Sequence, residues 1–230
     1  MVHGIEKFRE YFGEFTGQYV FIGGSACSVL IDDFGGDFRA TKDLDESFGV
    51  TFWKFIEDGK YVRKQKSNGD EQFYRFSDPE ADDFPEMIEL FSRKPDGINL
   101  KMDSHLSPIP FEDSVSSLSA ILLNDDYYEM LLNGRKVVNG FSVLDLEYII
   151  LFKIRAWIDL SKRKEEGESI DSRNIKKHKN DIFRLIQYSD PEKKIEITGE
   201  IKDNFDFFME KILLEQIDLK NLKIKGNLKQ

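Results

Sequence analysis

Two aspartates separated by one residue, Asp43 and Asp45, are the side chains of this sequence whose type and spacing best fit metal chemistry. On a strand, residues two apart point to the same face, so both carboxylates would project together while Leu44 turns into the core. Adjacent anions repel each other unless a cation lies between them. A hard ion such as Mg²⁺ or Mn²⁺ binds carboxylates together with substrate phosphate oxygens. A solvated surface pair is the alternative.

A glycine turn precedes this pair in the sequence. The β-prone run 19–22 predicts a buried strand, and it leads into Gly23, Gly24 and Ser25. We expect a short helix to follow, with Ser25 as its N-cap. Glycines let the backbone approach a phosphate closely, and a helix N-terminus presents N–H groups and a positive dipole end. A tight strand-to-helix turn without a ligand is the alternative. No Gly-Lys-Ser/Thr follows, so this is not a phosphate loop of the ATPase kind.

Together the two features resemble a known constellation. The stretches Phe21-Ile-Gly-Gly-Ser-Ala26 and Arg39-Ala-Thr-Lys-Asp-Leu-Asp45 resemble the DNA polymerase β-like nucleotidyltransferase superfamily. More narrowly, they look like the AbiEii-type nucleotidyltransferases of toxin–antitoxin systems, whose pattern is Gly-Gly-Thr/Ser-Ala followed by Arg-x-Ser/Thr-x-Asp-hydrophobic-Asp. The chain matches each element of that pattern, at Gly23, Gly24, Ser25, Arg39, Thr41, Asp43 and Asp45. The resemblance implies nucleotide binding by the first five and Mg²⁺ or Mn²⁺ at the aspartates, with a nucleoside triphosphate as substrate.

The resemblance also implies a third catalytic carboxylate on a neighbouring strand. Glu89, within the apolar stretch 87–91, is the candidate for this further metal ligand. A lone acid in an apolar strand needs a partner, because burying an unpaired charge is unfavourable. A solvated strand face is the alternative, and related sequences often have Asp here.

In the C-terminal half, the resemblance implies a lysine on a long helix and an acid on the next helix. Lys153 lies in the apolar run 149–154, where it would bind triphosphate or form a structural ion pair. Asp181 would orient Lys153 or take part in proton transfer; a capping or surface salt-bridge role is the rival. Only short segments of this half resemble the family, and His178-Lys179-Asn180 departs from its commoner Arg-x-Lys-Asp motif.

Composition limits the partners. The formal charge is −10, so a polyanion must be met by local basic residues or by metal. A basic cluster that could follow an RNA backbone, or form a solvated helix face, comprises Lys162, Arg163, Lys164, Arg173, Lys176, Lys177 and Lys179. The single cysteine, Cys27, excludes an intrachain disulfide. The sequence shows neither a signal-peptide core nor a membrane-spanning run, which predicts a soluble cytoplasmic protein without membrane contact.

We expect an α+β fold: a nucleotidyltransferase-like mixed sheet flanked by helices, followed by a mainly helical C-terminal part. Residues 1–141 would form the catalytic core, and residues 142–230 a helical region that completes the cleft. Periodicity and turn signals predict helices at 5–15, 52–59, 142–164, 172–188 and 201–214. They predict strands at 19–22, 42–50, 61–66, 71–77, 86–92, 127–132 and 136–141. Ser142 would cap the long helix.

The expected function is metal-dependent transfer of a nucleoside monophosphate from a nucleoside triphosphate to an acceptor. As in AbiEii-type toxins, tRNA or protein is the implied acceptor and a cognate antitoxin the implied partner. One alternative is a small-molecule enzyme resembling the aminoglycoside-modifying nucleotidyltransferases, whose acceptor pockets are acidic; acids of this kind are Asp78, Glu80, Asp82 and Asp83. Another is a non-catalytic nucleotide-binding module on the same fold.

Overall fold

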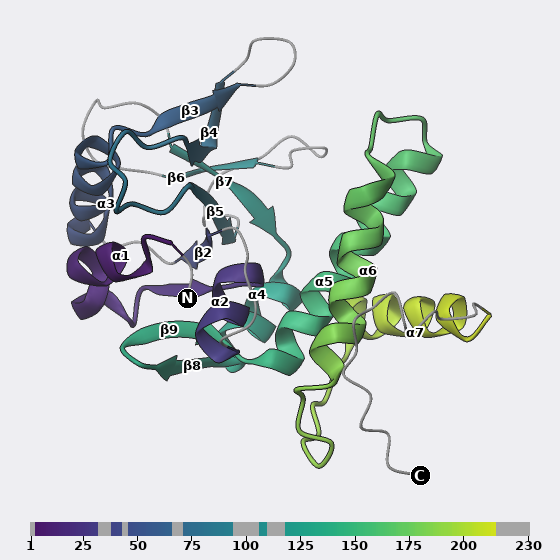
Figure 1. Cartoon of the computed structure of the whole chain (residues 1–230). Helices are drawn as coiled ribbons and strands as arrows, with labels where there is room; N and C mark the ends of the chain where they lie inside the picture. Colours follow the sequence, from purple (N-terminus) through teal and green to yellow (C-terminus); the bar gives the residue numbers. More distant parts are fainter. Residues whose placement is uncertain are drawn as a thin grey trace. The chain divides into compact units, whose positions relative to one another are not determined.

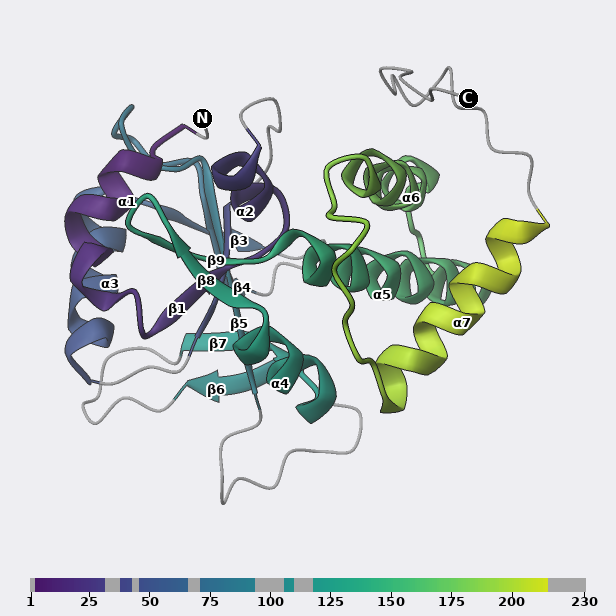
Figure 2. The same cartoon turned by 90° about the horizontal axis from the view of Figure 1, so that it is seen from below.

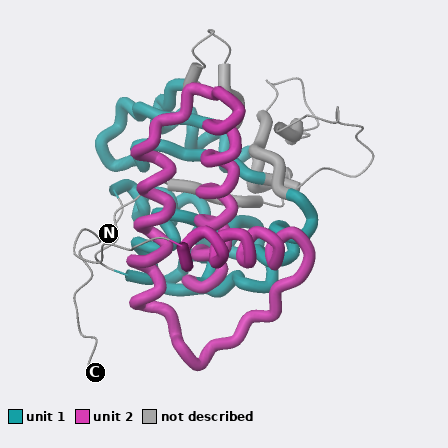
Figure 3. Tube along the Cα trace, turned by 90° about the vertical axis from the view of Figure 1, so that its right-hand side faces the viewer, with its two compact units in different colours: residues 1–145 teal, residues 146–230 magenta. Residues whose placement is uncertain are grey.

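The chain has a mixed α+β structure made of two compact units, residues 1–145 and 146–230 (Figure 3). A computed structural model describes residues 3–31, 38–42, 46–65, 71–93, 106–109 and 118–214. The sequence places the change of character after residue 141, four residues earlier than the limit between the units.

The first unit is built on one branched, mixed sheet (Figure 1). Its strands are β1 (Tyr19–Phe21), β2 (Phe38–Lys42), β3 (Val62–Gln65), β4 (Glu71–Ser77), β5 (Met87–Arg93), β6 (Leu106–Ile109), β7 (Leu118–Leu123), β8 (Arg135–Val138) and β9 (Phe141–Leu144). The main path runs β3-β4-β5-β2-β1-β9-β8, and β7 pairs with both β5 and β6. The strand that precedes the Asp-x-Asp pair, β2, is therefore central: it is antiparallel to β1 and parallel to β5.

Four α-helices and one short 3₁₀-helix accompany this sheet. They are α1 (Ile5–Phe12), η1 (Gly13–Phe15), α2 (Gly23–Leu30), α3 (Glu46–Asp58) and α4 (Asp125–Asn133). The spacing that predicts α1 also sets its buried face, because Ile5, Phe8 and Phe12 are all buried. In Figure 2, α1 and α3 lie on one side of the sheet and α2 on the other.

Aromatic side chains form the core between the sheet and the α1–α3 side. Phe8 contacts both Phe12 and Phe21, with ring centroids 4.2 and 4.9 Å apart. Phe55 of α3 lies 4.8 Å from Phe84 by the same measure. Stacked and edge-on rings at these separations combine large buried area with favourable ring contacts. The aromatic contacts therefore show which side chains of a strand point toward α1 and α3. The residues between them on the same strand point to the other side of the sheet.

The second unit, as far as residue 214 to which it is described, contains three helices: α5 (Leu146–Glu165), α6 (Ser172–Ile186) and α7 (Gly199–Leu213). Both α6 and α7 pack on α5. The ring of Trp157 on α5 meets that of Phe208 on α7 edge-on, at 5.4 Å between centroids. Asp171 caps α6, since its side chain accepts a hydrogen bond from the backbone N–H of Arg173. No helix in the described part of the chain is both long and apolar enough to cross a membrane.

The predicted strand at 127–132 is wrong, because this segment is helical. The Asn124 side chain accepts a hydrogen bond from the Tyr127 backbone N–H at 3.0 Å and so caps α4. Asp125 and Asp126 follow in the first turn, where carboxylates interact favourably with the helix dipole. Cap and charge together outweigh the strand preference of the two tyrosines, Tyr127 and Tyr128.

Three other boundaries differ from the prediction. The strand expected at 42–50 is wrong: β2 ends at Lys42, and α3 already begins at Glu46. Ser142 does not cap the long helix but lies buried within β9. The strand expected at 136–141 is two strands joined at Asn139 and Gly140, whose φ angles are 52° and 80°. Two consecutive residues with positive φ form the tight turn that joins the strands of a β-hairpin.

Candidate functional site

The metal pair itself lies outside the described residues. Asp43 and Asp45 fall between β2, which ends at Lys42, and α3, which begins at Glu46. Their predicted position on one face of a strand therefore stays a prediction. Within the described ranges, no group of three or more His, Cys, Asp or Glu side chains could hold a metal ion.

The glycine turn lies directly after β1, but its cap differs from the prediction. The helix begins at Gly23, with Ile22 in the N-cap position. Gly23 has a φ of 62°, a left-handed conformation that glycine adopts without steric strain. This early start moves Ser25 into the first turn of α2, where it is fully buried, so the predicted role of Ser25 as N-cap is wrong. The backbone N–H groups of this first turn have no partner within the helix itself.

The register of β2 determines which motif residues lie near that turn. Ala40 is paired with Phe21 on β1, whereas Lys42 is paired with Tyr19. Because the two strands are antiparallel, Arg39 lies one residue closer to the glycine turn than Ala40 does. Lys42, the residue that precedes Asp43, lies at the opposite end of β1. The structure thus places Arg39, rather than the end of β2, beside the glycine turn.

Neighbouring side chains show which side of the sheet faces α1. Phe21 faces α1 through its contact with Phe8, and Ala40 is its partner in register. Figure 2 shows that α2 lies on the side of the sheet opposite α1. The side chains of Arg39 and Thr41 lie outside the described part of the structure, so their predicted role in nucleotide binding stays a prediction.

Glu89 lies on the side of the sheet that faces away from α3, and it is buried. It is 1% exposed, and its carboxylate forms an ion pair with the Arg75 guanidinium of β4. The neighbouring pair Phe76 and Ile88 faces the other way, since Phe76 contacts the ring of Phe52 on α3. The expected alternative of a solvated strand face for Glu89 is therefore wrong. Arg75 was not predicted from the sequence, although a basic residue inside the strand run 71–77 is a signal comparable to Glu89.

In the second unit, Lys153 and Asp181 meet. The Lys153 Nζ lies 2.7 Å from Asp181 Oδ2, and the two residues are 8% and 7% exposed. Arg184, one turn along α6, has its Nη1 at 3.8 Å from the other carboxylate oxygen. The rival expectation of a surface salt bridge or cap for Asp181 is wrong, because the pair is buried. The ion pair that was one of two alternatives for Lys153 is present.

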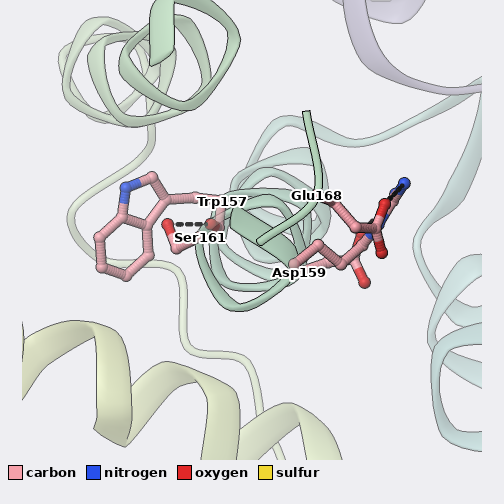
Figure 4. A network of polar contacts seen from close by, with 5 residues as sticks. Trp157, Asp159, Ser161 and Glu168 are labelled. Atoms are coloured by element: carbon pink, nitrogen blue, oxygen red, sulfur yellow. Dashed lines mark hydrogen bonds and ion pairs between the residues drawn. The ribbon is translucent and has the colours of Figure 1, made fainter. Parts of the chain in front are cut away.

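The basic cluster is partly neutralised by nearby acids. Arg163 Nη2 lies 2.7 Å from Glu168 Oε2 and its Nη1 3.5 Å from Asp159 Oδ2. The hydrogen bonds that the Arg163 guanidinium donates to the Glu168 carboxylate are the main cause that raises the pKa of Arg163. Figure 4 shows Asp159 and Glu168 on the side of α5 that faces away from Trp157. Arg173 likewise pairs with Asp171, and the Lys164 ammonium bonds to the Ser172 hydroxyl.

Besides Lys164, three lysines of the cluster are exposed: Lys162, Lys176 and Lys177. They are the members best placed to meet an anionic partner, since an exposed ammonium loses little hydration in the free protein.

Neither the models of known protein families, nor the curated proteins, nor the solved structures give a match to this chain. The candidate site is therefore defined by its motif residues and by the strand register that groups them.

Proposed function

We propose that the chain is a metal-dependent nucleotidyltransferase that transfers a nucleoside monophosphate from a nucleoside triphosphate to an acceptor. The observation that carries the proposal is the strand register that brings residue 39 of β2 level with the end of β1, where α2 begins at Gly23. These are the motif elements that resemble the nucleotidyltransferase superfamily, and a helix N-terminus beside an arginine suits a phosphate chain.

Asp43 and Asp45 are the residues that would hold Mg²⁺ or Mn²⁺. Their carboxylate oxygens fit such hard ions, which supply charge neutralisation at the phosphates when bound. The chain's own groups would do the rest: Arg39 and the first turn of α2 would bind the triphosphate. The motif implies that Lys153 also binds the triphosphate; its ammonium, which has three donors, pairs with Asp181 at 2.7 Å.

The register sets a strict condition on this proposal. Asp43 follows the end of β2 that pairs with the start of β1, whereas the glycine turn follows the end of β1. If both belong to one site, changes at either must act on the binding of the same nucleotide. Titration calorimetry with each of the four nucleoside triphosphates, with Mg²⁺ and with a chelator, measures this directly.

The decisive variant is the double change Asp43→Asn and Asp45→Asn. We expect wild-type protein to bind one nucleotide more tightly with Mg²⁺, and the double variant to lose this increase. Asp82→Asn is the matched control, because Asp82 is an exposed acid of the same unit. An unchanged Mg²⁺ effect in the double variant would end the metal-site proposal.

The acceptor is identified with the same proteins. Labelled nucleotide is incubated with total RNA, with total protein and with an aminoglycoside mixture, and transfer of label is followed. We expect label in RNA or protein, dependent on Mg²⁺ and absent in the double variant. Label in the small molecule alone would support the aminoglycoside-like alternative, and tight binding without transfer to any acceptor would favour a non-catalytic module.

A further inference from the structure

Glu89 has a permanent positive partner. It is 1% exposed in the middle of β5, and its Oε1 forms an ion pair with the guanidinium of Arg75, the residue level with it on the adjacent strand β4. A buried carboxylate is unfavourable unless a positive charge compensates it. Arginine keeps its charge at any pH that the protein meets. Arg75 therefore compensates Glu89 without any metal ion.

The surroundings of this pair do not suit a hydrated divalent cation. Mg²⁺ usually keeps several of its waters and gives them up reluctantly. Water scarcely reaches the Glu89 side chain, at 1% exposure, whereas it reaches that of Arg75, at 32%. The accessible member of the pair is thus a cation, which repels a metal ion. Magnesium would have to displace Arg75 before it could bind Glu89.

The strand register also separates Glu89 from the Asp-x-Asp motif. β2 and β5 are parallel, with position 39 level with Glu89 and position 41 level with Phe91. Lys42, the last residue of β2, is thus three residues beyond the level of Glu89, roughly 10 Å at about 3.3 Å per residue, and the motif begins only after it. Oxygen ligands of one Mg²⁺ lie about 2 Å from the ion and hence within about 4 Å of each other. The register therefore does not favour an ion shared by Glu89 and the motif.

We infer that Glu89 is the internal counter-ion of Arg75 and not a metal ligand, so that Asp43 and Asp45 hold the metal of the proposed enzyme without it. The presence of that metal rests on the proposed function. The surroundings of Glu89 thus do not fit the role of third carboxylate that the resemblance implies; the ion pair instead joins β4 to β5. Mg²⁺ held by two carboxylates takes its remaining ligands from water and from substrate phosphates.

The test compares nucleotide binding with and without metal, using the full chain. Calorimetry with ATP, GTP, CTP and UTP in turn, in Mg²⁺ and in a chelator, gives for each protein the ratio of the two affinities, the Mg²⁺ effect. The variants are Glu89→Gln, Glu89→Gln with Arg75→Gln, and Asp43→Asn with Asp45→Asn. Loss of a group that merely supports a metal ligand typically lowers metal affinity about 10–100-fold. We expect both proteins that carry Glu89→Gln to keep the wild-type Mg²⁺ effect, and the aspartate variant to lose it.

Arg75→Gln alone gives different results for the two roles of Glu89. If Glu89 is a counter-ion, Arg75→Gln lowers the melting temperature and leaves the Mg²⁺ effect unchanged. Adding Glu89→Gln then restores part of the melting temperature, because no buried charge remains unpaired. If Glu89 were a metal ligand, Arg75→Gln would remove a repelling neighbour and increase the Mg²⁺ effect, which adding Glu89→Gln would abolish.

A Mg²⁺ effect that falls about tenfold or more in either protein with Glu89→Gln would overturn the inference and leave the proposed function intact. The doubly changed protein keeps this test available if Glu89→Gln alone does not fold. Wild-type protein without a Mg²⁺ effect for any of the four nucleotides would instead remove the proposed function. The melting temperatures still decide the counter-ion role in that case, because a double variant no more stable than Arg75→Gln contradicts it.

Discussion

The two units each bury a carboxylate against a basic side chain, but they do so in different ways. In the first unit, Glu89 is inaccessible while its partner Arg75 remains 32% exposed. In the second unit, the side chains of Lys153 and Asp181 are both 10% exposed and form an ion pair between helices α5 and α6. The guanidinium of the first pair is accessible to water. The second is a closed pair whose charges already satisfy each other.

The units also differ in charge. Residues 1–145 carry 27 acidic and 15 basic side chains, a formal charge of −12, whereas residues 146–230 carry 16 acidic and 18 basic ones, a charge of +2. An acidic unit repels a free nucleotide unless metal or local arginines offset its field. Arg39 and the Asp-x-Asp pair are the motif residues of the first unit that would provide this, so the proposed binding site depends on local chemistry and not on overall charge.

The largest expected effect is that of Lys153→Met. It leaves the Asp181 carboxylate buried without its main partner, a change that typically destabilises a protein by about 3–5 kcal/mol. Arg155→Met is the control, because two residues along a helix point about 200° apart and Arg155 therefore lies on another face of α5. Denaturant unfolding of both variants, followed by nucleotide titration, separates stability from binding.

The two possible roles of Lys153, a structural ion pair and a phosphate contact, give different results in this experiment. If Lys153 serves only the pair, Lys153→Met lowers the free energy of unfolding and nucleotide affinity stays the same. If Lys153 reaches the triphosphate, affinity falls as well. A stability loss no larger than that of Arg155→Met would contradict the closed-pair interpretation.

Arg75→Gln should have a smaller effect on stability, about 1–3 kcal/mol, because water can reach the position that the guanidinium leaves. Adding Glu89→Gln should recover part of this loss, since the buried charge is then removed as well. Urea unfolding of the two single variants and the double variant gives the coupling free energy. Equal losses for Arg75→Gln and Lys153→Met would erase the contrast between the open and the closed pair.

Local sequence signals predicted the elements whose periodicity is strong. The buried face of α1 and the two strands β3 and β4 agree with the elements predicted from periodicity, while residues 66–70 between these strands lie outside the described part of the chain. The signals failed where they conflicted. At 127–132, β-prone tyrosines follow a cap and two acids, and the cap prevailed. Leu106–Ile109 contains Pro108 and no alternation, so β6 gave no strand signal; it is defined only by pairing with β7.

The candidate site shows a second limit of sequence reasoning. The motif predicted that Arg39 and the glycine turn belong together, and the register of β1 and β2 is consistent with this. The partner of Glu89 could not be predicted, because Arg75 is 14 residues away on another strand and only the register brings them level. Burial also separates alternatives that the sequence leaves open: Asp181 could be a partner of Lys153 or a surface acid, and the structure buries it against Lys153.

The smallest expected effect concerns the basic cluster and sharpens the contrast between buried and exposed charge. Arg163 is 43% exposed and held by Glu168. Exposed ion pairs contribute about 0–1 kcal/mol, so Arg163→Gln should leave stability nearly unchanged. Its charge is already offset, so RNA binding should change little too.

The exposed lysines differ, because each neutralised phosphate releases counterions. We therefore expect Lys176→Gln with Lys177→Gln to weaken binding of total RNA and to reduce its salt dependence by about one slope unit per lysine. Filter binding at several salt concentrations measures both, and an equal loss in Arg163→Gln would show that ion pairing does not decide which cations of α5 and α6 meet the RNA.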